Sequence, residues 1–176
     1  MTRTHEATDL LPVASIPIRP GIDIDIDALL HAVVCNLRAE GFRLAGFLQA
    51  RGGGDVRLSD LAGGGSHGIT QRLGPGSHGC KLDPRGLAEA AAVALAALNG
   101  RPDLLVIPRF GKAEVEGEGL RAVIARACEL QIPVLVAVRE ASAPAWQDFT
   151  GGLARTLPAE LGAVLHWCRT ALAHPA

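Results

Sequence analysis

Aromatic side chains are scarce in this sequence. They make up 3% of the residues, and tyrosine is absent. Proteins that stack single-stranded nucleic acid need such rings, so this function is disfavoured. The sequence contains seventeen Lys and Arg residues and eighteen Asp and Glu residues, so its net charge is −1. Non-specific nucleic-acid binding needs an excess of cations to replace counterions, so we expect no nucleic-acid partner.

Long apolar runs are missing as well. The sequence contains no stretch of about 20 apolar residues, so we expect no membrane-spanning helix and no membrane partner. Residues 1–15 include acidic side chains and Pro12, where a secretory signal needs an uninterrupted apolar core. We therefore expect a cytoplasmic protein.

The four cysteines stand apart in the sequence, and none belongs to a C-x-x-C pair. This spacing argues against a zinc knuckle, and we expect no metal site. Cys35, Cys128 and Cys168 fall in helical patterns and are predicted to be small core residues. Cys80 lies in a glycine-rich loop, where it could contact a ligand.

Apolar residues make up 48% of the 176 residues, which is enough to form a core in a chain of one-domain length. Residues 1–13 are predicted to be a flexible tail and residues 14–176 a single domain. Apolar runs predict strands at 14–18, 43–49, 104–107 and 134–138. Helical periodicity predicts helices at 27–40, 84–98, 119–130 and 158–173, with Asp27 and Asp83 as N-caps. Strands that alternate with helices predict a three-layer α/β fold with a mostly parallel sheet.

Residues 51–82 differ from the rest because glycine is frequent in them. Two short strand-like segments, 55–61 and 67–72, predict a small glycine-rich β-hairpin at one edge or end of the sheet.

Ligands of open parallel sheets bind beyond the carboxyl ends of the strands, so we examined the loops that follow them. The loop after the first strand lacks the G-x-x-x-x-G-K-[ST] motif that holds phosphates. It carries Asp23, Asp25 and Asp27 instead, which would repel a triphosphate. Asp27 could cap the helix while the other two are solvated, or the three could form a cation or sugar-hydroxyl site.

The loop after residues 104–107 places Gly111, Lys112 and Glu114 close together. Such a group could contact a phosphate through Lys112 and orient water through Glu114, or it could be a solvated loop with a surface ion pair. The loop after residues 134–138 offers Arg139, which we expect to be a surface residue.

The glycine-rich loop before Asp83 is a further candidate, because its backbone N–H groups could converge on an anion. It could also be a flexible connection. The predicted ligand-binding residues of the two loops are Gly74, Gly76, Ser77, His78, Gly79, Cys80, Lys81, Gly111, Lys112 and Glu114.

Three stretches, RAEGFRLAGFLQ, LGPGSHGCKLDP and PDLLVIPRFGKAEVEGEGLR, resemble an uncharacterised bacterial domain family encoded in molybdenum-transport operons. That family is distantly similar to the THEP-type P-loop nucleoside triphosphatases, so the resemblance implies a P-loop-like fold. In those enzymes a D-E-I-G-K-M-E motif supplies the metal-binding and catalytic carboxylates. Residues 108–114 keep its glycine, lysine and last glutamate, whereas Pro108 and Arg109 replace the two leading acidic residues.

We therefore predict a non-hydrolytic ligand-binding protein on a degenerate P-loop scaffold. The resemblance makes a molybdate-like oxyanion or a nucleotide the small anionic ligand, in molybdenum transport or processing. Two alternatives stay open: a residual nucleoside triphosphatase, and a protein-interaction module without a ligand. The sequence identifies no cofactor, and it leaves the oligomeric state open, a homo-oligomer included.

Overall fold

A computed structural model describes residues 12–71, 73–76 and 82–173. A seven-stranded sheet runs through the molecule in the order β4-β3-β2-β5-β6-β1-β7. The pairs β2–β5, β5–β6, β6–β1 and β1–β7 are parallel, and β3 and β4 join antiparallel at one side. The strands are β1 (Val13–Ile18), β2 (Leu44–Gly52), β3 (Asp55–Asp60), β4 (Ser66–Gly68), β5 (Leu104–Phe110), β6 (Val134–Arg139) and β7 (Arg155–Thr156).

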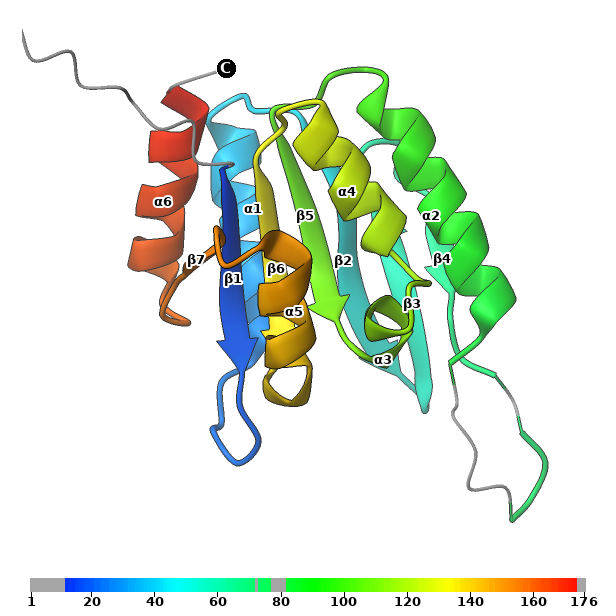
Figure 1. The fold of residues 1–176 in the computed structure, drawn as a ribbon. Coiled ribbons are helices and arrows are strands. Elements are labelled where there is room, and N and C mark those ends of the chain that lie inside the picture. Colours follow the sequence, from blue (N-terminus) through cyan, green and yellow to red (C-terminus); the bar gives the residue numbers. More distant parts are fainter. Residues whose placement is uncertain (1–11, 72, 77–81, 174–176) are drawn as a thin grey trace, which may run out of the picture.

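Helices cover both faces of this sheet, as Figure 1 shows. They are α1 (Ile26–Ala39), α2 (Pro84–Leu98), α3 (Lys112–Val115), α4 (Arg121–Glu129), α5 (Ala143–Thr150) and α6 (Leu161–Ala173), with a 3₁₀ turn, η1 (Glu140–Ser142). One apolar core joins the sheet to α2, α4 and α5, and a second joins it to α1 and α6. The expected three-layer, mostly parallel α/β fold is therefore confirmed. None of the helices in the described ranges is long and apolar enough to cross a bilayer.

The central strands are fully buried, as their continuous apolar sequences predict. Leu105 and Ile107 of β5, and Leu135 and Val136 of β6, have no exposed surface. In a parallel sheet covered on both faces, side chains on either side of a strand enter a core. These buried strands therefore determine where the loops that follow β5 and β6 begin.

Several predicted boundaries are wrong. The N-cap of α1 is Asp25, which accepts the Ala28 N–H at 2.9 Å, and Asp27 lies in the first helical turn. The helix predicted at 119–130 starts at Arg121, because Gly119 has a positive φ of 61°. The last helix starts at Leu161 instead of residue 158. Sequence periodicity also missed the short elements α3, α5 and β7.

The predicted core position of Cys35 is also wrong: Cys35 is exposed. Cys128 is partly buried and Cys168 is buried, and burial raises the pKa of the Cys168 thiol to about 12. Two of the three helical cysteines thus pack as small apolar residues, as the sequence predicts.

The glycine-rich region forms an antiparallel extension of the sheet. Gly53 and Gly54 connect β2 to β3 with φ of 60° and 84°, the two positive values that a type I′ hairpin turn requires. The β3 strand then pairs with the three residues of β4, which is shorter than the predicted segment 67–72. A bridge between Thr70 and Leu82 closes the base of the following loop.

Replacing Leu105 by Ala is expected to reduce the free energy of unfolding by about 2–5 kcal/mol, through lost apolar transfer and the cavity left behind. Val93→Ala on α2 is the matched control, since Val93 is 36% exposed. Urea denaturation measures both. A loss below about 0.5 kcal/mol for Leu105→Ala, the usual range at a surface, would contradict the position of β5 in the core.

Candidate functional site

Three arginines from neighbouring strands meet beyond the carboxyl ends of the sheet. Arg51 lies near the end of β2, Arg109 near the end of β5, and Arg139 at the end of β6. All three line one cavity of about 470 Å³. Because these strands are adjacent and parallel, their ends bring the guanidinium groups to the same edge. The site is therefore rich in positive charge.

Asp27 balances part of this charge from the first turn of α1. Its carboxylate lies 2.9 Å from Arg109 Nη2 and 3.9 Å from Arg51 Nε. The pair with Arg109 is largely shielded, with side-chain exposures of 22% and 16%. Desolvation lowers the pKa of Arg109, and the attraction of Asp27 opposes this shift. The buried guanidinium is thus held in place by an internal counter-ion.

Glu114 lines the cavity with a carboxylate that is buried. Its Oε2 accepts the Gly111 N–H at 2.9 Å, and its Oε1 accepts the Leu120 N–H at 3.0 Å. Burial raises the pKa of Glu114, and these two hydrogen bonds oppose the shift. A side chain at Gly119 would collide with Glu114 Oε1. Both carboxylate oxygens of Glu114 therefore hold the backbone of the loop between β5 and α4 in place.

Gly111 and Lys112 precede Glu114 in the chain and differ in exposure. Gly111 is buried, and a Cβ atom there would lie 3.5 Å from Cδ and Nε of Arg139. The side chain of Lys112 is 76% exposed and lies 3.8 Å from Glu116, a surface ion pair that contributes little to stability. The structure therefore brings Gly111, Lys112 and Glu114 together at the cavity, with Lys112 at its rim.

The glycine-rich loop meets the same cavity through the residues at its base. Thr70 and Leu82 line the cavity, whereas Gly74 and Gly76 are exposed and do not. Gly76 has a φ of 84°, the positive value that a convergent loop needs. The remaining predicted binding residues of this loop lie outside the described residues: Ser77, His78, Gly79, Cys80 and Lys81.

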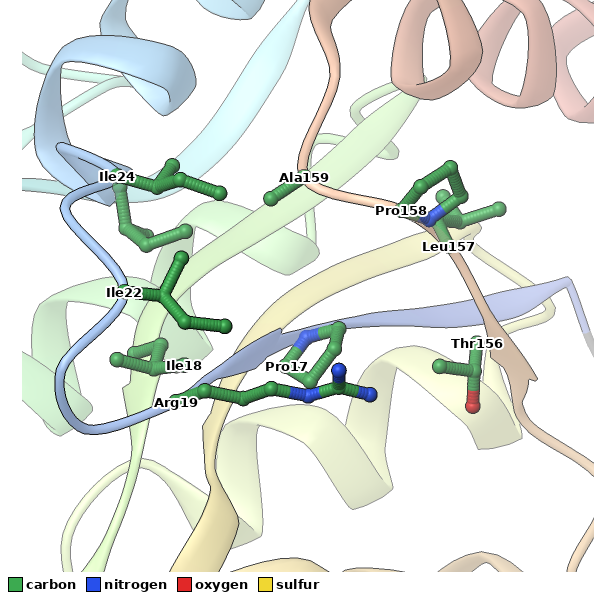
Figure 2. Close-up of a pocket in the computed structure, with 10 residues that line it drawn as sticks. Pro17, Ile18, Arg19, Ile22, Ile24, Thr156, Leu157, Pro158 and Ala159 are labelled. Atoms are coloured by element: carbon green, nitrogen blue, oxygen red, sulfur yellow. The ribbon is translucent and has the colours of Figure 1, made fainter.

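The loop of residues 19–25, between β1 and α1, borders a different hollow of about 330 Å³. Figure 2 shows Ile22 and Ile24 extending from this loop toward Leu157, Pro158 and Ala159. Ile22 is 49% exposed and Ile24 is 45% exposed. Apolar side chains thus occupy the place where P-loop proteins carry a phosphate-binding loop.

No group of three His, Cys, Asp or Glu side chains within 12–71, 73–76 and 82–173 could hold a metal ion.

Sequence reasoning did not select Arg51, Arg109 or Arg139 as binding residues, and it treated Arg139 as a surface residue. Arg139 is exposed, and it nevertheless lines the cavity beside Gly111. One signal was available in the sequence: each arginine stands at the end of an apolar strand. That the three arginines lie together follows only from the strand order, which places β2, β5 and β6 side by side.

Comparisons with known proteins agree with this architecture. The family described as "Protein of unknown function (DUF2478)" matches residues 15–167, and the chain belongs to this family. A curated relative from Bradyrhizobium diazoefficiens, named "Molybdenum import ATP-binding protein ModC 2", is 39% identical over 163 residues. The match covers 89% of this chain and 18% of that relative, so the chain spans under a fifth of its length.

A solved structure of a human cancer-related nucleoside triphosphatase has a similar fold. It superposes with a TM-score of 0.59 at 16% identity, covering 92% of this chain and 95% of that one. This similarity concerns the fold alone, and it confirms the expected resemblance to the fold of a nucleoside triphosphatase.

Glu114→Gln is expected to lower the free energy of unfolding by about 1–3 kcal/mol. An amide has a single acceptor oxygen, so one of the two buried N–H groups would lose its partner. Glu116→Gln, at a side chain that is 57% exposed, is the matched control and should change stability by less than about 0.5 kcal/mol. Urea denaturation at neutral pH measures both.

The raised pKa of Glu114 also gives this comparison a pH dependence. The folded protein binds the proton more tightly than the unfolded chain, so ionisation of Glu114 costs stability as pH rises from about 4.5 through the raised pKa. This part of the pH dependence should be absent in Glu114→Gln. Identical stability at all pH values in both proteins would contradict the structural role of the carboxylate.

Proposed function

We propose that this domain binds a small oxyanion group at the arginine-lined cavity and does not hydrolyse it. The ligand is either a molybdate-like ion or the phosphate of a nucleotide. One observation carries the proposal: Arg51, Arg109 and Arg139 converge on one cavity from three adjacent strands.

Arginine suits this task because its planar guanidinium donates two parallel hydrogen bonds to a tetrahedral oxyanion. Two carboxylates accompany the three guanidinium groups: Asp27 pairs with Arg109 and Arg51, and Glu114 lines the cavity. Both oxygens of Glu114 already accept backbone hydrogen bonds. An incoming anion would supply the missing negative charge.

The curated relative supports both candidate ligands. Its name assigns it to molybdenum import and to ATP binding, and 39% identity over most of this chain supports a related role here. Molybdate is a dianion that needs donors, and the cavity provides them. The glycine-rich loop joins this cavity through Thr70 and Leu82, so its predicted donors, among them Ser77 and Lys81, remain part of the proposal.

Two features support binding without hydrolysis. Residues 19–25 contain no lysine and border an apolar hollow, so this loop offers no P-loop cradle for a triphosphate. Pro108 and Arg109 stand where THEP-type enzymes carry acidic residues, and Glu114, the remaining candidate base, is engaged by Gly111 and Leu120. A water molecule would have to compete with both backbone donors.

The purified protein is expected to release no phosphate from ATP or GTP with Mg²⁺ above a buffer blank. A phosphate-release assay measures this directly. Turnover on the order of 1 per second, abolished by Glu114→Gln, would contradict the proposal and identify a residual nucleoside triphosphatase.

Arg139→Gln is expected to weaken oxyanion binding by about 10- to 150-fold, because hydrogen bonds to a charged group contribute roughly 1.5–3 kcal/mol. Titration calorimetry with molybdate, sulfate, phosphate and ATP measures the affinity. Arg51→Gln should give a loss of the same order. Lys112→Ala should have a smaller effect, because its side chain is mostly exposed and faces Glu116.

Arg85→Gln is the matched control for these titrations. Arg85 is exposed on α2 and pairs with Glu89 on the same helix, so its replacement should leave the affinity unchanged. An equal loss in Arg85→Gln and Arg139→Gln would indicate a general charge effect and would remove the cavity as the binding site.

A further inference from the structure

The arginine-lined cavity has two chemically different halves. Its cationic half lies at the strand ends, and its other half is an aliphatic wall. The wall is built from β3, the segment that follows β4, the start of α2 and the start of α4. Its side chains are Val56, Leu58, Ile69, Leu82, Leu87 and Leu120.

Most of this wall is rigidly placed. Leu58, Ile69, Leu87 and Leu120 are between 1% and 6% exposed, so they belong to the packed core and also line the cavity. Val56 and Leu82 are half-buried at its margin. Thr70 is the polar side chain set among them, and its Oγ1 accepts the Val56 N–H at 2.7 Å. The wall therefore offers apolar contact and few hydrogen bonds.

The size of the cavity exceeds the needs of a bare oxyanion. Four oxygen atoms around a central atom fill roughly 120 Å³, if each oxygen takes a water-sized volume of about 30 Å³. The cavity holds about 470 Å³, a volume typical of sites for organic ligands, which are mostly apolar with a few polar anchors. A bare ion would leave the exposed parts of Val56 and Leu82 in contact with water.

We propose that the cavity binds an organic phosphate monoester, with its phosphate on the three arginines and an apolar body of about one ring on the aliphatic wall. This inference rests on the oxyanion binding proposed above, and at the same site it favours a phosphate monoester over the molybdate-like ion and the nucleotide named there. The apolar body would displace water mainly from Val56 and Leu82, the half-buried members of the wall, which is favourable in proportion to the area covered.

The wall also disfavours a nucleotide as the occupant. A nucleotide carries ribose hydroxyls and base edges, and each polar group placed on an aliphatic wall without a partner costs free energy. Gln49 and Thr70 are the uncharged polar side chains that line the described part of the cavity, and they are too few to satisfy those groups. A ligand with a phosphate and a plain hydrocarbon body leaves no such group unpaired.

Titration calorimetry with inorganic phosphate, phenyl phosphate and AMP tests the inference. Phenyl phosphate is expected to bind at least tenfold more tightly than inorganic phosphate, because covering about 60 Å² of apolar surface at roughly 25 cal/mol per Å² corresponds to a factor of ten. AMP is expected to bind no more tightly than phenyl phosphate.

Val56→Thr probes the wall without a change of shape. It should weaken phenyl phosphate by several-fold and leave inorganic phosphate unchanged. Val93→Thr on α2 carries the same substitution away from the cavity and should change neither affinity. If Val56→Thr lowers the melting temperature too far for titration, Leu82→Ala at the margin of the wall should show the same selective loss.

The outcomes separate the inference from the function on which it rests. Equal affinities for phenyl phosphate and inorganic phosphate, both weakened by Arg139→Gln, would overturn the inference and leave oxyanion binding standing. Tenfold tighter binding of AMP than of phenyl phosphate would also overturn it, in favour of a nucleotide. Absence of binding by phosphate, sulfate, molybdate, ATP and phenyl phosphate would overturn both.

Discussion

The carboxylate of Asp27 allows three arginines to share one edge of the sheet. Like charges gathered at a partly dry site repel one another, and desolvation adds a further cost for Arg109. Asp27 lies within 4 Å of both Arg109 and Arg51. Its negative charge therefore offsets both the repulsion between the arginines and the desolvation cost of Arg109. Because Asp27 belongs to α1, this contact also ties the first turn of that helix to β5 and β2. The positions of Arg51 and Arg109 therefore depend on this side chain.

This arrangement depends in turn on which aspartate caps α1. Asp23, Asp25 and Asp27 alternate in sequence, and each has the chemistry of an N-cap. Asp25 takes the role, which leaves the carboxylate of Asp27 free to face Arg109. Local sequence predicts that a helix starts here. It cannot predict which aspartate serves as the cap, because the choice depends on an arginine more than eighty residues away along the chain.

The fold was more predictable than the site, for a physical reason. The buried strands around Leu105 and Leu135 follow from continuous apolar runs, and the N-cap at Asp83 follows from the Asp-Pro pair beside it. Such signals are local. The convergence of Arg51, Arg109 and Arg139 instead depends on the order β2-β5-β6, which joins distant segments. The sequence predicts that Gly111, Lys112 and Glu114 lie together, and the structure places them at one cavity. The two backbone partners of Glu114 become visible only in three dimensions.

The two outer strands of the sheet are unusually short. β4 has three residues and β7 has two, so each presents only a brief row of unpaired backbone groups. Long exposed edges act as templates on which another chain can add a strand, and short edges limit this hazard. Another copy of this domain that paired with β4 or β7 would therefore form few backbone hydrogen bonds along those two strands.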